Sequence, residues 1–190
     1  MTRSKISWLF AIWVIAVVLS GGIMMSFHQP FRTPSDKILS LADRPSAPGW
    51  RAIHVLSGSC GCSQTVMRHL LERHAFKDVA EQVVVIDGPA PYLSGSTELL
   101  SALQKQGFPV RHLTEVEVPP DSGLHGVPLL IVASPTNEVV YAGGYGKSSS
   151  QDATLLHQIR FGQHPRALPI VGCAIGSQVR RKADPFHLKY

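Results

Sequence analysis

The sequence predicts an α/β fold, with a mixed central sheet flanked by helices on both faces, preceded by one N-terminal transmembrane helix. Strand-like and helix-like segments alternate after residue 50. The segments 82–86, apart from Gln82 at its start, and 127–133 are apolar, which is typical of strands that are covered on both faces. An uncharged run from Ile6 to Met25 opens the chain. These three observations support the predicted class.

The run from Ile6 to Met25 predicts a membrane anchor. At about 1.5 Å per residue it covers about 30 Å, the thickness of a hydrocarbon core. Arg3 and Lys5 precede the run, which favours a cytoplasmic N-terminus. We therefore expect residues 1–25 to form a cytoplasmic tail and anchor, with the remaining chain outside the cytoplasm.

A cleaved signal peptide is the alternative for this segment. Ser20, Gly21 and Gly22 provide the small residues of a cleavage site. The apolar run continues past them through Met25, which favours the uncleaved anchor.

The rest of the chain divides into three parts. Residues 26–49 are rich in proline and predict a linker with one short helix around 36–42. Residues 50–162 hold the alternating elements and form the folded domain. Residues 163–190 form a C-terminal extension that contains Cys173.

The elements of the domain follow from apolar periodicity and turn residues. The predicted strands are 51–57, 82–86, 109–113, 127–133 and 138–142, and the predicted helices are 63–73, 96–106 and 152–160. Strand–helix alternation requires parallel pairs, and the late hairpin adds antiparallel ones. Pro128 near the start of a buried strand indicates a special backbone there, such as a cis bond after Val127.

Composition excludes several classes of protein. The chain has 190 residues, of which 44% are hydrophobic and 16% charged, so it is not disordered. The formal net charge is +5, but the excess of basic over acidic residues lies at the two ends of the chain. Because a nucleic-acid site is a basic stripe on the folded domain, we expect no nucleic-acid partner.

Cys60 and Cys62 are the candidate reactive residues. They lie in a turn-forming loop between the first strand and the first helix, where a helix N-terminus stabilises a thiolate. Two thiols in one loop can exchange disulfides, one attacking and the other resolving. Only Gly61 separates them, so a bridge between them closes a small, strained ring that glycine accommodates without a clash.

Two other interpretations of the cysteines remain. They can be ordinary buried apolar residues. They can also bind copper, because soft thiolates with a histidine suit Cu(I); the ligand set would then be Cys60, Cys62, His125 and Cys173.

The block from Trp50 to Tyr145 resembles the thioredoxin-like superfamily, most closely its membrane-anchored TlpA/ResA type. The motif Ser59-Cys60-Gly61-Cys62-Ser63, the proline strand 126–132 and the hairpin 134–141 followed by Gly143-Gly144-Tyr145 carry this resemblance. The sequence departs from the usual motif in having one spacer between the cysteines instead of two, and Ser59 where tryptophan is usual.

The resemblance implies a thioredoxin fold and thiol–disulfide oxidoreductase activity on protein thiols, without a bound cofactor, at the periplasmic side of the inner membrane. It implies that Pro128 packs beside the cysteine pair and that backbone near Val127 pairs with substrate. By analogy, Cys60 is the exposed nucleophile and Cys62 the less accessible resolver. A non-catalytic interaction module on the same scaffold is a further alternative.

Cys173 has two interpretations. It can be a small apolar residue in a docked tail, or a third redox or metal partner for Cys60 or Cys62. Its apolar surroundings, Ile170-Val171 before and Ala174-Ile175 after, favour the first.

Overall fold

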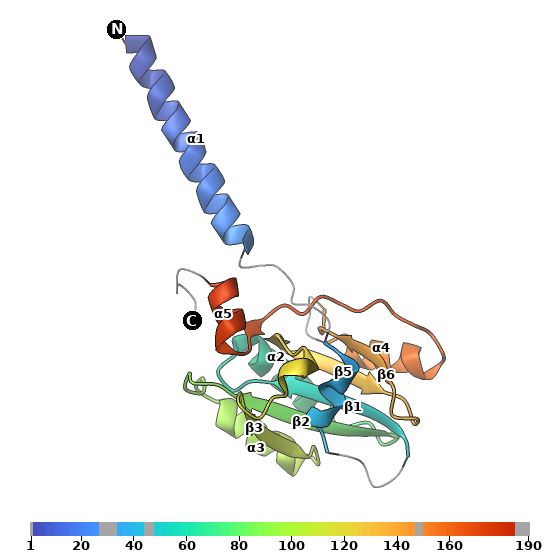
Figure 1. Cartoon of the computed structure of the whole chain (residues 1–190). Helices are drawn as coiled ribbons and strands as arrows, with labels where there is room; N and C mark the ends of the chain where they lie inside the picture. The colour runs from blue at the N-terminus through green and yellow to red at the C-terminus, as the bar shows by residue number, and fades with distance from the viewer. Residues whose placement is uncertain (1, 27–33, 44–47, 147–149, 185–190) are drawn as a thin grey trace.

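The computed structural model describes residues 2–26, 34–43, 48–146 and 150–184, with the side chains of 2–7, 23–26 and 182–183 outside the description. Its centre is a mixed five-stranded sheet with strand order β3-β2-β1-β5-β6 (Figure 1). The strands are β1 (Trp50–Leu56), β2 (Val79–Asp87), β3 (Val110–Thr114), β5 (Leu129–Ala133) and β6 (Val139–Gly143). The mixed α/β sheet predicted from the sequence is confirmed.

Three α-helices connect or follow these strands. They are α2 (Gly61–Arg73), α3 (Ser96–Lys105) and α4 (Asp152–Arg160). β1 pairs parallel with β2, and β2 with β3, whereas β5 runs antiparallel to both β1 and β6. The predicted element order is therefore correct over the domain, with boundaries shifted by a few residues.

The two faces of the sheet are covered differently. Apolar side chains of α2, α3 and α4 pack together in one buried cluster against one face. The other face is covered by the 3-10 helix η1 (Asp36–Leu41) and by parts of the C-terminal segment. Because the two βαβ crossovers advance in the same direction along the sheet, right-handed connections put α2 and α3 on the same side. Helices were predicted on both faces of the sheet. Among the described residues, the helix that covers the second face is η1.

Part of the segment predicted as a linker is packed into the domain. Ile38 and Leu41 of η1 are buried in the second apolar cluster. The Ser35 N–H donates to the Ser122 carbonyl at 3.0 Å, near the 3-10 helix η2 (Pro120–Ser122). The short helix predicted around 36–42 is thus present, and it contributes to the core.

The predicted strand 127–133 is interrupted at Pro128. Gly126 and Val127 form the separate strand β4, and β5 begins after the proline. Proline has no backbone N–H to donate to a sheet ladder. The Val127–Pro128 peptide bond is cis, as the sequence indicated.

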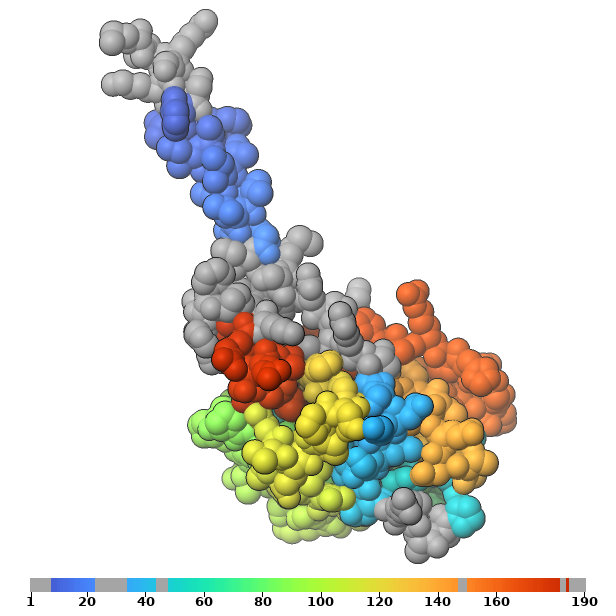
Figure 2. Space-filling view, viewed as in Figure 1, coloured from blue at the N-terminus to red at the C-terminus, as the bar shows by residue number. Residues whose placement is uncertain are grey.

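The C-terminal extension returns to the domain. Its strand β7 (Cys173–Ala174) pairs antiparallel with β4, and the helix α5 (Ser177–Ala183) follows. Arg180 of α5 donates to Glu115 at 2.7 Å. In Figure 2 the red surface of this segment lies against the yellow and green surface of the middle of the chain.

The N-terminal helix α1 spans Thr2–Ser26 and contributes no described side chain to either apolar cluster. Its large apolar side chains between Trp8 and Leu19 are exposed. Among the described residues, no helix reaches the combined length and hydropathy expected of a membrane span. The predicted anchor runs from Ile6 to Met25. The side chains of residues 6–7 and 23–25 in this run lie outside the described part of the structure.

Candidate functional site

The cysteine loop is held at the junction of β1 and α2. Cys60 is the N-cap of α2; its N–H donates to the Ser57 carbonyl at 3.2 Å, and its carbonyl accepts from the Gln64 N–H at 3.0 Å. The Ser63 hydroxyl accepts from the Ser57 N–H at 3.1 Å. The helix therefore begins two residues earlier than predicted, and Cys60 lies at its positive end.

Contacts from the region of α3 fix the other side of this loop. The Gly58 carbonyl accepts hydrogen bonds from the Ser96 hydroxyl at 2.7 Å and from the Leu93 N–H at 2.9 Å. The Tyr92 ring packs so closely on Gly58 that a Cβ there would lie 2.6 Å from it. These contacts hold the loop in one conformation at the end of β1.

Cys60 forms a disulfide with Cys173 of β7, with the two Cα atoms 6.0 Å apart. The expected Cys60–Cys62 pair is therefore not the bridge in this state. Cys173 lies in a docked segment and packs against an apolar cluster, as the first interpretation predicted, but it is also bonded to Cys60. The pairing of β7 with β4 brings Cys173 to the loop across 113 residues of sequence. The only signal for it in the sequence was the Gly172-Cys173 step in an apolar segment.

The expected exposure of the two loop cysteines is reversed. Cys60 is fully buried, whereas Cys62 is an exposed free thiol. Cys62 lies in the first turn of α2 but outside the buried face of that helix, which carries Ser63, Gln64, Val66, Met67 and Leu70. Cys60 is bonded to the returning C-terminal segment and packs within the second apolar cluster.

The role predicted for Gly61, in a ring closed by Cys60 and Cys62, stays a prediction, because Cys60 is bonded to Cys173 in this state. A Cβ at Gly61 would meet nothing within 4 Å, and its φ is not in the left-handed region. In this disulfide state neither crowding nor backbone conformation requires glycine between the two cysteines.

Pro128 lies beside the cysteine site. The Cys60 Sγ is 3.9 Å from the carbonyl oxygen of Val127, the residue joined to Pro128 by the cis bond. The structure thus brings Cys60, at a helix N-terminus, beside the strand junction at Val127–Pro128, which is far from it in sequence.

The copper ligand set of the alternative interpretation is not assembled. No group of three or more His, Cys, Asp or Glu side chains in the described part of the chain could hold a metal ion. The sulfurs of Cys60 and Cys173 are bonded to each other, and the carbonyl of His125 accepts from the Ile175 N–H at 2.9 Å. In this state His125 contributes to docking the C-terminal segment through its backbone.

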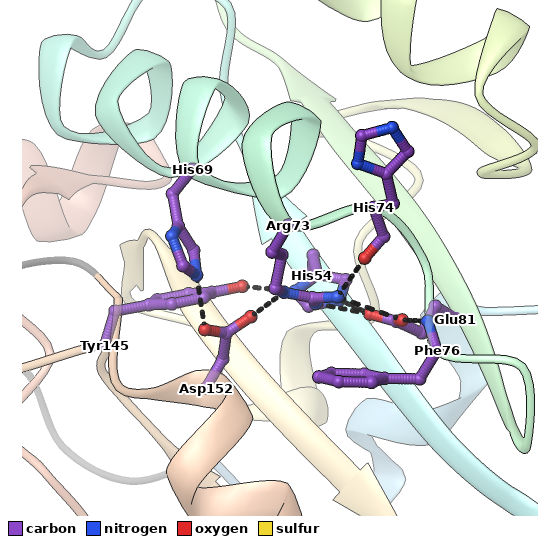
Figure 3. A network of polar contacts seen from close by, with 8 residues as sticks. All are labelled: His54, His69, Arg73, His74, Phe76, Glu81, Tyr145 and Asp152. Atoms are coloured by element: carbon purple, nitrogen blue, oxygen red, sulfur yellow. Dashed lines mark hydrogen bonds and ion pairs between the residues drawn. The ribbon is translucent and has the colours of Figure 1, made fainter.

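A buried polar network crosses the sheet side of α2 (Figure 3). His54 of β1 is fully buried, with Nε2 2.9 Å from Glu81 Oε2 and Nδ1 2.6 Å from the Tyr145 hydroxyl. Arg73 of α2 donates to Glu81 and, at 2.7 Å, to Asp152. Asp152 also lies 2.7 Å from His69 Nε2. His54 is therefore a core histidine.

The network keeps two buried carboxylates charged. Burial alone raises the pKa of Glu81, but hydrogen bonds from His54 and Arg73 outweigh it and lower the pKa to about 2. Burial likewise raises the pKa of Asp152, and the nearby charge of Arg73 brings it below its usual value. Burial raises the pKa of the Tyr145 hydroxyl well above 10. These groups tie α2, β2 and α4 together.

The chain is similar to solved structures at low sequence identity. No family model and no curated protein matches the chain. A solved structure described as a hypothetical protein from Sinorhizobium meliloti is 14% identical, with a TM-score of 0.51, covering 78% of this chain and 92% of that one. A conserved protein from Geobacillus kaustophilus is 15% identical, with a TM-score of 0.48, covering 78% of this chain and 88% of that one. A structure described as a thioredoxin-like protein in the oxidised form is 13% identical, with a TM-score of 0.49. The match covers 72% of this chain and 98% of that one.

The fold is thioredoxin-like. A parallel β-α-β unit leads through a cis-proline junction into an antiparallel β-hairpin and a helix. The cysteine loop joins the first strand to the first helix of that arrangement.

Proposed function

We propose that this chain is a membrane-anchored periplasmic oxidoreductase that exchanges disulfides with protein substrates through Cys60 and Cys62, without an organic cofactor. The disulfide of Cys60 at the N-terminus of α2, two residues from the exposed thiol of Cys62, carries the proposal. A helix N-terminus stabilises the thiolate, which is the attacking and leaving form in disulfide exchange.

Reduction of a partner proceeds in two exchanges. The Cys60 thiolate attacks one sulfur of the partner disulfide, the partner S–S bond breaks, and the second partner sulfur leaves as a thiolate that takes a proton from water. Cys62, as thiolate, then attacks Cys60, and the first partner sulfur leaves in the same way. The partner gains two electrons and two protons, which Cys60 and Cys62 lose.

Cys173 adds a third, redox-neutral exchange. Its thiolate attacks Cys60, the Cys60–Cys62 bond breaks, and Cys62 takes up a proton. The product has the pairing described above, with Cys60 bonded to Cys173 and Cys62 free. Run in reverse, the three exchanges oxidise a partner dithiol.

The exposed apolar side chains of α1 favour attachment of this chain to a membrane surface. Its described apolar side chains are exposed, with Trp8 71% and Leu9 68% accessible. Exposed apolar area of this kind is unfavourable in water and is removed by lipid. We propose that α1 holds the domain at the periplasmic face of the inner membrane.

Trapping of the half-reacted state tests the exchange. The full-length chain is reduced and mixed with a peptide dimer joined by one disulfide. The wild type should release both halves, whereas the double variant Cys62→Ser, Cys173→Ser should retain one half on Cys60, read by mass spectrometry after digestion.

Cys60→Ser is the control for this experiment and should leave the dimer intact. Retention of a peptide half on Cys62 would assign the attack to the other cysteine. Unchanged cellular function of Cys60→Ser would instead favour a non-catalytic interaction module.

A further inference from the structure

The chain beyond α4 is held against β6 as far as residue 169. The Leu168 carbonyl accepts from the Gly144 N–H at 2.9 Å, and the Leu168 N–H donates to the Tyr141 hydroxyl at 3.2 Å. Pro169 follows in close contact, since a Cβ on Gly144 would lie 2.1 Å from the Pro169 carbonyl oxygen. We call the described residues beyond this point, 170–184, the strap.

The noncovalent contacts of the strap with the domain are short and local. Ile170 and Ile175 are buried in the second apolar cluster, and β7 pairs with β4 over two residue pairs. The Ile175 N–H then donates to the His125 carbonyl at 2.9 Å. Segments with few buried contacts open at a lower free energy than the core, and a short strand pair adds little stability by itself.

An ion pair holds α5, which follows β7, against the other end of the sheet. The Arg180 guanidinium donates to both carboxylate oxygens of Glu115, with Nη2 2.7 Å from Oε2. The two side chains remain 19% and 17% exposed, so water and salt weaken their attraction. The helix has seven residues, which is too short to be stable without its contacts to the domain.

The disulfide between Cys60 and Cys173 is therefore the strongest attachment of the strap. Cys60 is 0% exposed, and it shares the second apolar cluster with Ile170, Cys173 and Ile175 of the strap. Movement of the strap away from the domain removes these three neighbours from the cluster around Cys60.

Resting on the function proposed above, we infer that the strap is a redox-controlled cover of Cys60. It is closed while Cys60 is bonded to Cys173, and it opens when that bond breaks, which gives partner disulfides access to Cys60. Regulation of the proposed exchange thus lies in the chain's own C-terminal segment.

A dithiol reductant opens the strap through two exchanges. One reductant thiolate attacks Cys173, the Cys60–Cys173 bond breaks, and Cys60 leaves as a thiolate that takes a proton from water. The second reductant thiolate attacks the first reductant sulfur, closes a cyclic disulfide and releases Cys173 in the same way. The dithiol loses two electrons and two protons, which the two cysteines gain.

Hydrogen exchange of the full-length chain in detergent micelles tests the opening. The N–H groups of Ile175, Arg180 and Asp184 are hydrogen-bonded in the closed strap, and mass spectrometry after digestion follows their exchange. With dithiothreitol they should exchange roughly tenfold faster or more, because the covalent tether is lost. The amides of β5 should be unaffected. Unchanged exchange of the strap amides after complete reduction would overturn the inference.

A double variant separates loss of the bond from other effects of the reductant. The chain with Cys62→Ala and Cys173→Ala cannot form the bridge, so its strap amides should exchange at the fast rate without dithiothreitol. Cys62→Ala alone keeps the bridge and should behave as the wild type does. Slow exchange in the double variant would overturn control of the strap by the disulfide.

Arg180→Gln and Arg181→Gln form a matched pair in the reduced chain. Both remove one positive charge from α5, but Arg180 contacts Glu115 whereas Arg181 is exposed. Arg180→Gln should speed strap exchange and alkylation of Cys60 by iodoacetamide about two- to fivefold, the range for a partly exposed ion pair. Arg181→Gln should match the reduced wild type. Alkylation of Cys60 that does not follow strap exchange would overturn the role of the strap as its cover.

The peptide-dimer experiment described above distinguishes this inference from the proposed function. Release of both peptide halves by a chain whose strap amides stay protected after reduction would overturn the strap and leave the exchange function standing. Opening of the strap without any reaction of the peptide dimer would overturn the exchange function, and with it the role of the strap in partner access.

Discussion

At the scale of single residues, burial and hydrogen bonding decide what each polar group does. His54 and Glu81 lie in the interior and are kept there by a connected set of partners. Cys62, two residues from a fully buried sulfur, is exposed and free. Neighbouring residues of similar chemistry thus have different roles because of the surface that each one faces.

Glu81→Gln should strongly destabilise the fold. The change leaves Arg73 without its main carboxylate partner in the interior, and removal of one member of a buried ion pair costs about 3–5 kcal/mol. Urea unfolding of the two proteins at neutral pH measures the difference. Glu138→Gln, at an exposed position, is the control and should change stability by less than about 0.5 kcal/mol.

The difference in the free energy of unfolding between wild type and Glu81→Gln should itself depend on pH. The pKa of Glu81 is about 2 in the folded state, against 4.5 ordinarily. A carboxyl whose pKa is lowered by folding stabilises the fold fully above the ordinary value and loses that contribution as the pH falls through the folded value. This difference in free energy should therefore be constant above about pH 5 and become smaller as the pH falls toward 2. A gap that widens in acid would contradict this assignment.

At the scale of elements, the proline junction separates two strands with different partners. β5 continues into the central sheet, whereas β4 pairs only with β7 among the described strands. β4 therefore offers a short edge, which the C-terminal segment covers. The packing of Gly172 against Val127 determines whether that segment fits.

Gly172→Ala should shift the disulfide away from Cys60–Cys173. The added methyl group would lie 2.0 Å from the Val127 carbonyl oxygen, so β7 must move away and Cys62 becomes the better-placed partner of Cys60. Equilibration in a thiol redox buffer, followed by digestion and mass spectrometry, gives the ratio of the two bridges. Gly61→Ala, where the methyl group meets nothing, is the control and should keep Cys60 paired with Cys173.

At the scale of the whole molecule, the Cys60–Cys173 bridge joins the beginning of the domain to the C-terminal extension. The two cysteines are 113 residues apart, so the bridge restricts a long loop of the unfolded chain. The same bridge fixes a segment that also packs through Ile170, Ile175 and Arg180. Oxidation state and stability are thereby linked.

Reduction of this bridge should lower the free energy of unfolding by roughly 2–5 kcal/mol, the range for loss of a native disulfide. Denaturant unfolding of the full-length chain with and without reductant measures the change. Cys62→Ala should show the same loss on reduction, since Cys62 is free in this state. A reduced chain as stable as the oxidised one would mean that the bridge does not restrict the unfolded chain.

Local patterns in the sequence determined most of the elements. Apolar runs and helical periodicity placed the sheet strands and the three domain helices within a few residues, because they reflect which faces are buried. The chemistry of proline likewise predicted an irregular backbone at Pro128, which the cis bond confirms. These features depend on a few neighbouring residues, and the sequence contains them directly.

The tertiary structure alone decided which sulfur Cys60 is bonded to, which cysteine is exposed, and why glycine stands at 172. Each depends on β7 meeting β4, a contact that brings Cys173 to a cysteine 113 residues earlier in the chain. No local periodicity records that contact, because a two-residue strand pair is set by the shape of the surface on which it docks. The sequence supplied the three sulfurs, and the packing of the C-terminal segment selected the bonded pair.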